Sequence, residues 1–224
     1  PSANRGIEIA KGGWITRIDA DDNYKPDFLS TLSDVIRGRA GNDFFISTWV
    51  SIMDSDGHRV VDVPVPSAAK VKRMLNVENY LYHTATCYSR ALWEKVGGYP
   101  DVQPDVIKVG GDDRVLWNKF FDSGAELVVI PKALMNYRVH FSNMSVVTGY
   151  GSGEWIISLY LKCGKLKEAR EEIQKNGSAV SKMNLKRSFY NILTYLPAGL
   201  VRVFMWELRP WLRLLMRRLK IIKR

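Results

Sequence analysis

Strand-like and helix-like segments alternate along the first 150 residues, and this alternation restricts the possible folds more than any other feature of the chain. Short β-prone runs, each ended by polar or glycine residues, are separated by runs with helical apolar spacing. We expect strands over 14–18, 44–52, 60–65, 80–88 and 127–130, and helices that begin near residues 26, 67, 89 and 112. The strands at 44–52 and 60–65 are joined by an Asp-Ser-Asp-Gly turn, which is typical of a hairpin. The pattern predicts an α/β fold with a mostly parallel sheet and an antiparallel edge.

A glycine-rich stretch at 149–153 separates this region from a C-terminal part with a different pattern. Residues 154–174 carry one apolar face at helical spacing, which predicts a helix. From residue 188 onward the chain is apolar and helical, interrupted by Pro197 and Pro210. We therefore expect an α/β domain over 1–150 and a helical extension over 151–224.

Composition excludes several classes of protein. The 224 residues are 46% hydrophobic and 25% charged, which excludes a disordered, collagen-like or wholly membrane-embedded chain. Of the net charge of +10, residues 201–224 contribute most, with eight basic side chains and one acidic side chain. The positive charge is thus a property of the tail, and we expect no nucleic-acid partner. Cys87 and Cys163 have no metal-ligand spacing and are predicted to be buried thiols.

Three carboxylates follow the first predicted strand, in the sequence Asp19-Ala20-Asp21-Asp22. Ligands of open α/β sheets bind at the carboxyl ends of strands. Asp19 and Asp21, two residues apart on an extended segment, lie on the same side and have the spacing to hold one hard divalent cation. The tetrapeptide alone favours the alternative, a solvated acidic turn that caps the next helix.

A second carboxylate pair, Asp112-Asp113, precedes a helical run. One of the two is expected to be the N-cap of that helix, a role that Asp fills well. A helix N-terminus also favours the ionised carboxylate, which suits a general base.

Several motifs follow one another in an order that resembles the central segment of family 2 glycosyltransferases, which have the GT-A fold. They are Asn4-Arg5-Gly6, Ala10-Lys11-Gly12, Asp19-Ala20-Asp21-Asp22, His83-Thr84-Ala85, Val96-Gly97-Gly98-Tyr99, Gly111-Asp112-Asp113 with Leu116-Trp117, and Tyr137-Arg138-Val139-His140. The resemblance covers about residues 3–146. It implies a GT-A-like, Rossmann-like mixed sheet flanked by helices, with a C-terminal helical extension.

The resemblance also implies roles for individual residues. Asp19 and Asp21 would hold Mn²⁺ or Mg²⁺, with His140 as a further metal ligand, and Asp113 would be the catalytic base, supported by Asp112. Five residues are expected to contact the donor diphosphate: Asn4, Arg5, Asp19, Arg138 and His140. Two residues, His83 and Trp117, are expected to contact the acceptor. Core positions are the alternative for His83 and Trp117.

The activity implied is that of an inverting, metal-dependent glycosyltransferase. It would move a sugar from a nucleotide-sugar, with a UDP-sugar as the expected donor, to a hydroxyl of a glycan or lipid-linked acceptor in bacterial cell-surface polysaccharide synthesis. The family's two N-terminal βα units, which hold the base, do not precede residue 1, so we expect a piece of a longer enzyme. The alternative is a catalytically degenerate, membrane-attached interaction protein.

The tail predicts attachment to a membrane surface. Over 200–224, apolar residues recur at spacings of three and four, with basic residues on the opposite face. The longest charge-free stretch in the region is shorter than the roughly 20 apolar residues that a spanning helix needs. A basic amphipathic helix with tryptophans is typical of an interfacial helix. We expect a cytoplasmic protein that is peripheral on the inner face of the plasma membrane; the alternative is a tail helix packed on the domain.

Overall fold

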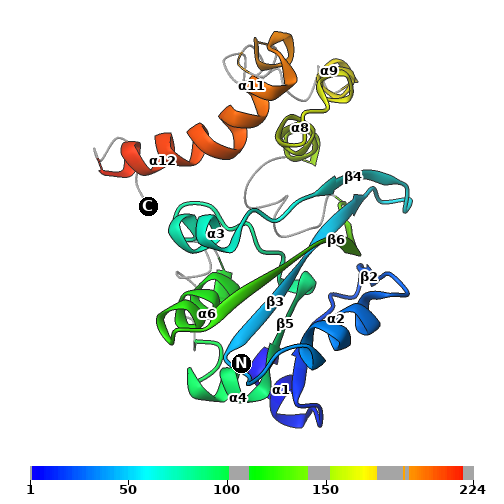
Figure 1. The fold of residues 1–224 in the computed structure, drawn as a ribbon. Coiled ribbons are helices and arrows are strands. Elements are labelled where there is room, and N and C mark those ends of the chain that lie inside the picture. The colour runs from blue at the N-terminus through cyan, green and yellow to red at the C-terminus, as the bar shows by residue number, and fades with distance from the viewer. Residues whose placement is uncertain (1, 101–110, 141–151, 176–188, 190–191, 219–224) are drawn as a thin grey trace. The chain divides into compact units, whose positions relative to one another are not determined.

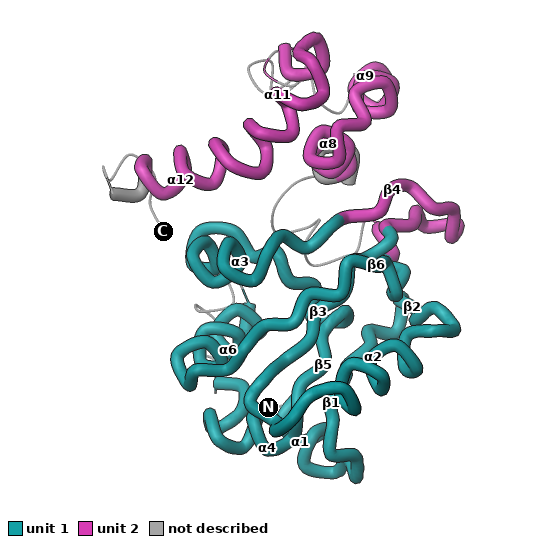
Figure 2. The backbone as a smooth tube through the Cα atoms, in the orientation of Figure 1, with its two compact units in different colours: residues 1–51, 64–137 teal, residues 52–63, 138–224 magenta. Residues whose placement is uncertain are grey.

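The computed structural model describes residues 2–100, 111–140, 152–175, 189 and 192–218. It is a mixed α/β structure with a curled sheet flanked by helices and a helical C-terminal part (Figure 1). The chain divides into two compact units, 1–51 with 64–137 and 52–63 with 138–224 (Figure 2). They are called unit 1 and unit 2. The boundary predicted at residue 150 lies outside the described residues.

The described residues form one six-stranded sheet with the order β1-β5-β3-β6-β2, and β4 pairs with β3. The strands are β1 Trp14–Thr16, β2 Asn23–Tyr24, β3 Phe44–Met53, β4 Arg59–Val63, β5 Thr86–Ser89 and β6 Glu126–Arg138. Registers are antiparallel for β1 with β5, β3 with β5 and β2 with β6. The prediction of a mostly parallel sheet is therefore wrong, and the sheet is mixed.

One pairing in this sheet is parallel, that of β3 with β6. Glu126 N donates to Asp43 O at 3.0 Å where the two strands begin, and Val139 N donates to Met53 O at 2.9 Å where they end. Two strands bonded start to start and end to end run in the same direction.

Helices cover both faces of the sheet in unit 1. They are α1 Ser2–Ile9, α2 Phe28–Arg37, α3 Ala68–Met74, α4 Arg90–Lys95 and α6 Gly111–Asp122. Phe28 and Leu32 of α2 form a buried cluster with Phe44 and Ile46 of β3. Phe45, between those two strand residues, points to the other face because strand side chains alternate.

The opposite face is covered by aromatic side chains of α6. The ring of Phe45 stacks on Trp117 at 5.8 Å and lies 5.2 Å from Phe120 and from Phe121. Burial on both faces explains why nine of the ten residues of β3 are buried, in place of an alternation of buried and exposed residues.

The predicted hairpin and one predicted helix cap are confirmed, whereas two predicted strands differ, since the strand expected over 127–130 extends over Glu126–Arg138 as β6. The predicted hairpin is formed by β3 and β4, and Ser89 caps α4 by accepting a 3.0 Å hydrogen bond from Leu92 N. The strand expected over 80–88 is instead a 3₁₀ turn, His83–Ala85, followed by the short β5. Local side-chain bonds explain the difference, since Asn79 Oδ1 accepts from Leu81 N and Thr86 Oγ1 donates to His83 O.

Unit 2 contains the helices α8 Ser152–Lys162, α9 Leu166–Lys175, α11 Ala198–Val203 and α12 Arg209–Arg218, with a π turn, η3 Phe204–Leu208, joining the last two. The single helix expected over 154–174 is wrong, because Gly164 (φ 73°) ends α8. Its N–H donates to Leu161 O at 3.1 Å and that of Lys165 donates to Tyr160 O at 2.8 Å, the bonding pattern of a Schellman cap.

Both cysteines are free thiols. Cys87 is buried in unit 1, as predicted, whereas Cys163 is only half-buried and its Sγ donates to Asp62 O at 3.3 Å within unit 2. In the described part of the chain, no helix combines the length and the apolar character needed to cross a membrane.

Candidate functional site

The acidic turn that follows β1 is held by hydrogen bonds in unit 1. Asp22 N donates to Asp19 O at 3.1 Å and closes the turn. Tyr24 Oη donates to Arg17 O at 2.7 Å and lies 2.8 Å from Thr16 Oγ1, so the phenol ties β2 to the end of β1. Burial raises the pKa of Tyr24 to about 12, so the phenol keeps its proton across the physiological range. The backbone that leads into Asp19 and Asp21 is therefore fixed before any ligand binds.

Arg17 is the cation nearest to this turn along the chain. Its Nη2 and Nε donate to Asp19 Oδ1 at 3.0 and 3.2 Å, and both side chains are about two-fifths exposed. Asp19 and Asp21 supply carboxylate oxygens, the donor type that Mg²⁺ and Mn²⁺ prefer, so their chemistry fits the predicted metal. A cation at Asp19 Oδ1 would have to displace the guanidinium of Arg17.

The second carboxylate pair lies in the first turn of α6, which begins at Gly111, so the prediction that one of the two is the N-cap is wrong. Asp113 Oδ1 accepts from Arg114 N at 2.7 Å, and Asp113 Oδ2 accepts from Asn79 Nδ2 at 3.0 Å. Burial raises the pKa of Asp113 to about 6, and the neighbouring charge of Asp112 acts in the same direction. A carboxyl with such a pKa is ionised at neutral pH yet basic enough to accept a proton from a hydroxyl under attack.

Gly111 makes room for this carboxylate. Its φ of 80° lies in the left-handed region, and a Cβ at this position would be 2.5 Å from Asp113 Oδ1. Both the positive φ at this position and the nearby carboxylate of Asp113 therefore favour glycine.

Electrostatic interactions connect the acidic turn, the start of α6 and the 3₁₀ turn. Burial lowers the pKa of His83 to about 4, and the positive charge of Arg17 lowers it further. The charges of Asp112 and Asp19 act on His83 in the opposite direction. Asp112 also interacts with Arg17. Unit 1 therefore brings four residues, Arg17, Asp19, His83 and Asp112, into one network.

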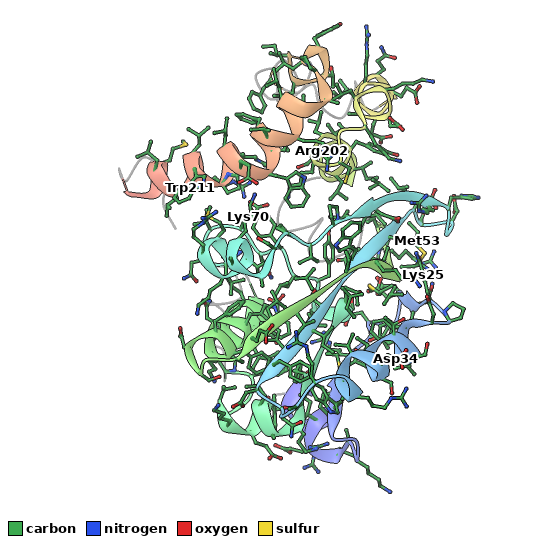
Figure 3. The ribbon with its side chains drawn as sticks, viewed as in Figure 1. Lys25, Asp34, Met53, Lys70, Arg202 and Trp211 are labelled. Atoms are coloured by element: carbon green, nitrogen blue, oxygen red, sulfur yellow. The ribbon has the colours of Figure 1, made fainter. Side chains whose placement is uncertain are left out.

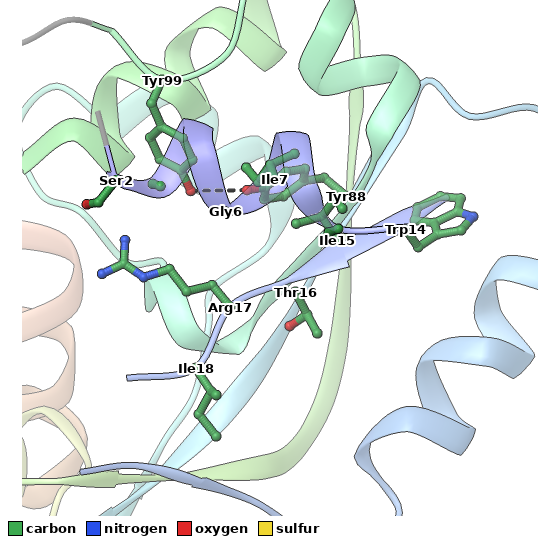
Figure 4. A pocket seen from close by; sticks show the side chains of 12 residues that line it. Ser2, Gly6, Ile7, Trp14, Ile15, Thr16, Arg17, Ile18, Tyr88 and Tyr99 are labelled. Carbon is green, nitrogen blue, oxygen red and sulfur yellow. Dashed lines mark hydrogen bonds between the residues drawn. The ribbon is translucent and has the colours of Figure 1, made fainter. Parts of the chain in front are cut away.

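A cavity of about 550 Å³ borders this network between α1 and β1 (Figure 4). Its walls are mainly apolar, and its polar lining includes Thr16, Arg17, Tyr88 and Tyr99. The two phenols are hydrogen-bonded at 3.1 Å, and Tyr99 Oη also bonds to Nε2 of His83. The volume is that of a small-molecule site. The acidic turn adjoins the cavity through Arg17 and Ile18, which are themselves lining residues.

The other predicted site residues of unit 1 have different surroundings. Asn4 is half-buried and bonded to the backbone of Tyr99, whereas Arg5 is exposed and ion-paired with Glu8 at 3.3 Å. Trp117 has no exposed surface and packs in the aromatic core, the alternative position considered for it. His83 contacts Trp117 edge-on at 5.8 Å, so His83 lies between the core and the cavity-lining Tyr99.

Arg138 and His140 belong to unit 2. Arg138 Nη1 donates to Ser55 O at 2.9 Å and contacts Asp54 O at 3.4 Å, which places the guanidinium on the β3–β4 turn. His140 is half-buried beyond the end of β6. The phosphate and metal roles of these two residues stay predictions.

The same turn contains the group of metal-capable side chains found among the described residues. Ligand atoms of Asp54, Asp56 and His58 lie within 4.8 Å of one another, on a largely exposed surface. Asp54 Oδ1 accepts from Asp56 N at 3.0 Å and from His58 N at 2.8 Å, so the cluster is explained by the hairpin turn itself.

Two cavity residues, Arg17 and Tyr99, were not predicted as site residues. The signal for Arg17 was a cation two residues before three clustered carboxylates, and the signal for Tyr99 was its position directly after Gly97-Gly98. No family model matches the chain, and no curated protein shows significant similarity to it.

Proposed function

We propose that the chain is part of an inverting, divalent-metal-dependent glycosyltransferase with a GT-A fold. The observation that carries the proposal is that unit 1 contains both the acidic turn beside Arg17 and a largely buried carboxyl in the first turn of α6, and that Arg17 interacts with the adjacent Asp112. Burial raises the pKa of that carboxyl, Asp113, to about 6. The mixed sheet flanked by helices is compatible with the fold.

In this proposal Asp113 accepts the proton of an acceptor hydroxyl while the oxygen attacks the anomeric carbon of the donor sugar. The bond from that carbon to the diphosphate oxygen breaks, and one in-line displacement inverts the configuration. Hydrogen bonds from Arg114 N and Asn79 Nδ2 orient the carboxylate for this step.

Asp19 and Asp21 would hold Mn²⁺ or Mg²⁺, which when bound offsets the charge that builds on the leaving diphosphate. Arg17 has two states available in this scheme. It neutralises Asp19 when no cation is bound, and once displaced from Asp19 its guanidinium can bind a phosphate oxygen. The half-exposed ion pair between them is weak enough for such an exchange.

We assign the substrates by class, as a nucleotide-sugar, with a UDP-sugar as the expected donor, and a glycan or lipid-linked acceptor of the bacterial cell surface. The test is release of nucleoside diphosphate from a panel of nucleotide-sugars, with Mn²⁺ or with a chelator. In the full-length enzyme, Asp21→Ala should abolish the metal-dependent release and leave the circular dichroism spectrum unchanged.

Asp34→Ala is the matched control, since Asp34 is an exposed carboxylate of α2 whose ion pair with Arg37 is remote in sequence from the turn. Its activity should equal that of the wild type. Release that survives the chelator or Asp21→Ala would reject the metal role. A folded full-length protein that binds neither Mn²⁺ nor donor would instead support the catalytically degenerate interaction protein.

A further inference from the structure

The last helices of unit 2 expose an apolar face. Six large apolar side chains between residues 198 and 218 are 44–58% exposed: Leu200, Val203, Leu208, Trp211, Leu212 and Leu215. Aliphatic and indole side chains of this size are seldom so exposed in a continuous series on a soluble surface. Figure 3 shows the side chains of Arg202 and Trp211 on this segment.

These residues are separate from the hydrophobic core of unit 2. Val201 and Met205 point into that core, where they pack against Ile157 and Leu161 of α8 and Ile173 of α9. Trp206 Nε1 donates to Lys162 O, which fixes the same side of the helix to α8. The segment is therefore held to its own unit by one face and presents a second apolar face to solvent.

The π turn keeps the exposed residues on one side. Leu200 and Leu208 are eight residues apart, one more than the seven that return to the same face of an α-helix. A π turn takes up one extra residue, so across η3 the effective spacing is seven. From Leu208 onward, Leu212 and Leu215 follow at four and three further residues, the ordinary helical spacing.

Positive charge accompanies this face. Residues 198–218 contain five arginines and one acidic residue, Glu207. Arg202 is exposed, and α12 carries four of the five arginines within ten residues. A helix with an apolar face, a basic polar face and a tryptophan has the composition of interfacial helices on anionic lipid.

From this combination we propose that α11, η3 and α12 dock on an anionic lipid bilayer, parallel to its surface, with the exposed apolar face in the interface. The charge selects this occupant over a second copy of the chain, since two copies would bring ten arginines together. The inference is independent of the proposed glycosyltransferase activity.

The experiment is flotation of the full chain with phosphatidylcholine vesicles, with and without phosphatidylglycerol, at low and high salt. We expect binding that requires phosphatidylglycerol and weakens with salt. Leu212→Glu with Leu215→Glu should reduce the bound fraction about tenfold or more, since it places two carboxylates in the interface. The matched control is Ile9→Glu with Leu29→Glu, the same change at positions that are both 65% exposed in unit 1.

The charge is tested separately. Arg202→Glu with Arg213→Glu should weaken binding to anionic vesicles by about tenfold or more, whereas Lys11→Glu with Lys167→Glu, equal in charge, should leave it near the wild-type value. Equal loss in the test and control pairs would mean that only net charge matters and would overturn the assignment. So would a chain that stays unbound and sediments as a dimer, since a second copy then covers the face.

Discussion

The side-chain amide of Asn4 holds both backbone polar groups of Tyr99. Its Nδ2 donates to Tyr99 O and its Oδ1 accepts from Tyr99 N, each at 2.9 Å. Helix α1 is thereby fixed to the residue whose phenol lines the cavity and contacts His83. Asn4 thereby positions Tyr99, and its predicted contact with the nucleotide-sugar donor stays a prediction.

Asn4→Ala should lower the free energy of unfolding by about 1–3 kcal/mol, because it leaves two partly buried backbone groups without their partner. Arg5→Ala, next along the same helix, should change it by less than about 0.5 kcal/mol, since the side chain is 74% exposed and its ion pair lies at the surface. Urea unfolding measures both. Equal effects would show that Asn4 acts through helix propensity alone.

Gly111→Ala should destabilise the chain more than Gly124→Ala. Both glycines have positive φ, 80° and 88°, but a Cβ at 124 has open space whereas one at 111 meets Asp113 Oδ1 at 2.5 Å. We expect about 1 kcal/mol for Gly124→Ala, from backbone conformation alone, and a further loss for Gly111→Ala. Thermal unfolding compares the two, and equal shifts would show that the carboxylate simply moves aside.

Asp113→Asn should reduce turnover by about 10²–10⁴-fold and leave donor affinity nearly unchanged, because a general base acts in the transition state. The pKa of Asp113, raised to about 6 by burial, predicts that wild-type kcat/KM falls as pH drops below about 6, where the carboxyl becomes protonated. The variant should lack this limb of the pH profile. If the limb persists in Asp113→Asn, a different group is the base.

His83 should make the fold less stable at acidic pH. Burial lowers the pKa of His83 to about 4, below its usual value near 6.5, so between these values the unfolded chain binds the proton more tightly. The contribution of the neutral His83 to the free energy of unfolding is complete above pH 6.5 and is lost as the pH falls towards 4. Relative to His83→Gln, the wild type should lose about 2–3 kcal/mol over that window in urea unfolding.

Tyr99→Phe separates the two sources of this effect. It removes the hydroxyl that bonds to His83 Nε2 but keeps the ring that buries the imidazole. Because burial is the main cause of the lowered pKa, the pH dependence should persist in Tyr99→Phe. If the difference in free energy of unfolding between Tyr99→Phe and the double variant Tyr99→Phe with His83→Gln does not change with pH, the hydrogen bond and not burial is the cause of the effect.

The order and type of most elements could be predicted because their signals are local. Apolar spacing indicated α2 and α6, and Ser89 before a helical run indicated the cap of α4, which the structure confirms. Strand direction is not local. An apolar run such as β3 is compatible with either direction, and the partner is decided by which strands lie beside it.

The candidate site could be predicted in part for the same reason. Clustered carboxylates are visible in a sequence, so the acidic turn and Asp112-Asp113 could be named. The contacts that decide what the other residues do are distant along the chain. Asn4 and Tyr99 are 95 residues apart, and nothing in either motif indicates that the amide binds the tyrosine backbone.

The π turn at Phe204–Leu208 also affects how the gene can change. Deleting one codon there would allow an unbroken α-helix, a gain in regular hydrogen bonding. The same deletion would bring Leu200 and the leucine now at 208 to a spacing of seven in a continuous α-helix, so Leu212 and Leu215 would keep the side that they share with Leu200. A change of η3 from π to α without the deletion would instead turn the ten residues of α12 by roughly 100° about the helix axis, since each residue of an α-helix turns by that angle. The extra residue of the π turn can therefore be lost, but not rewound, without loss of the apolar face.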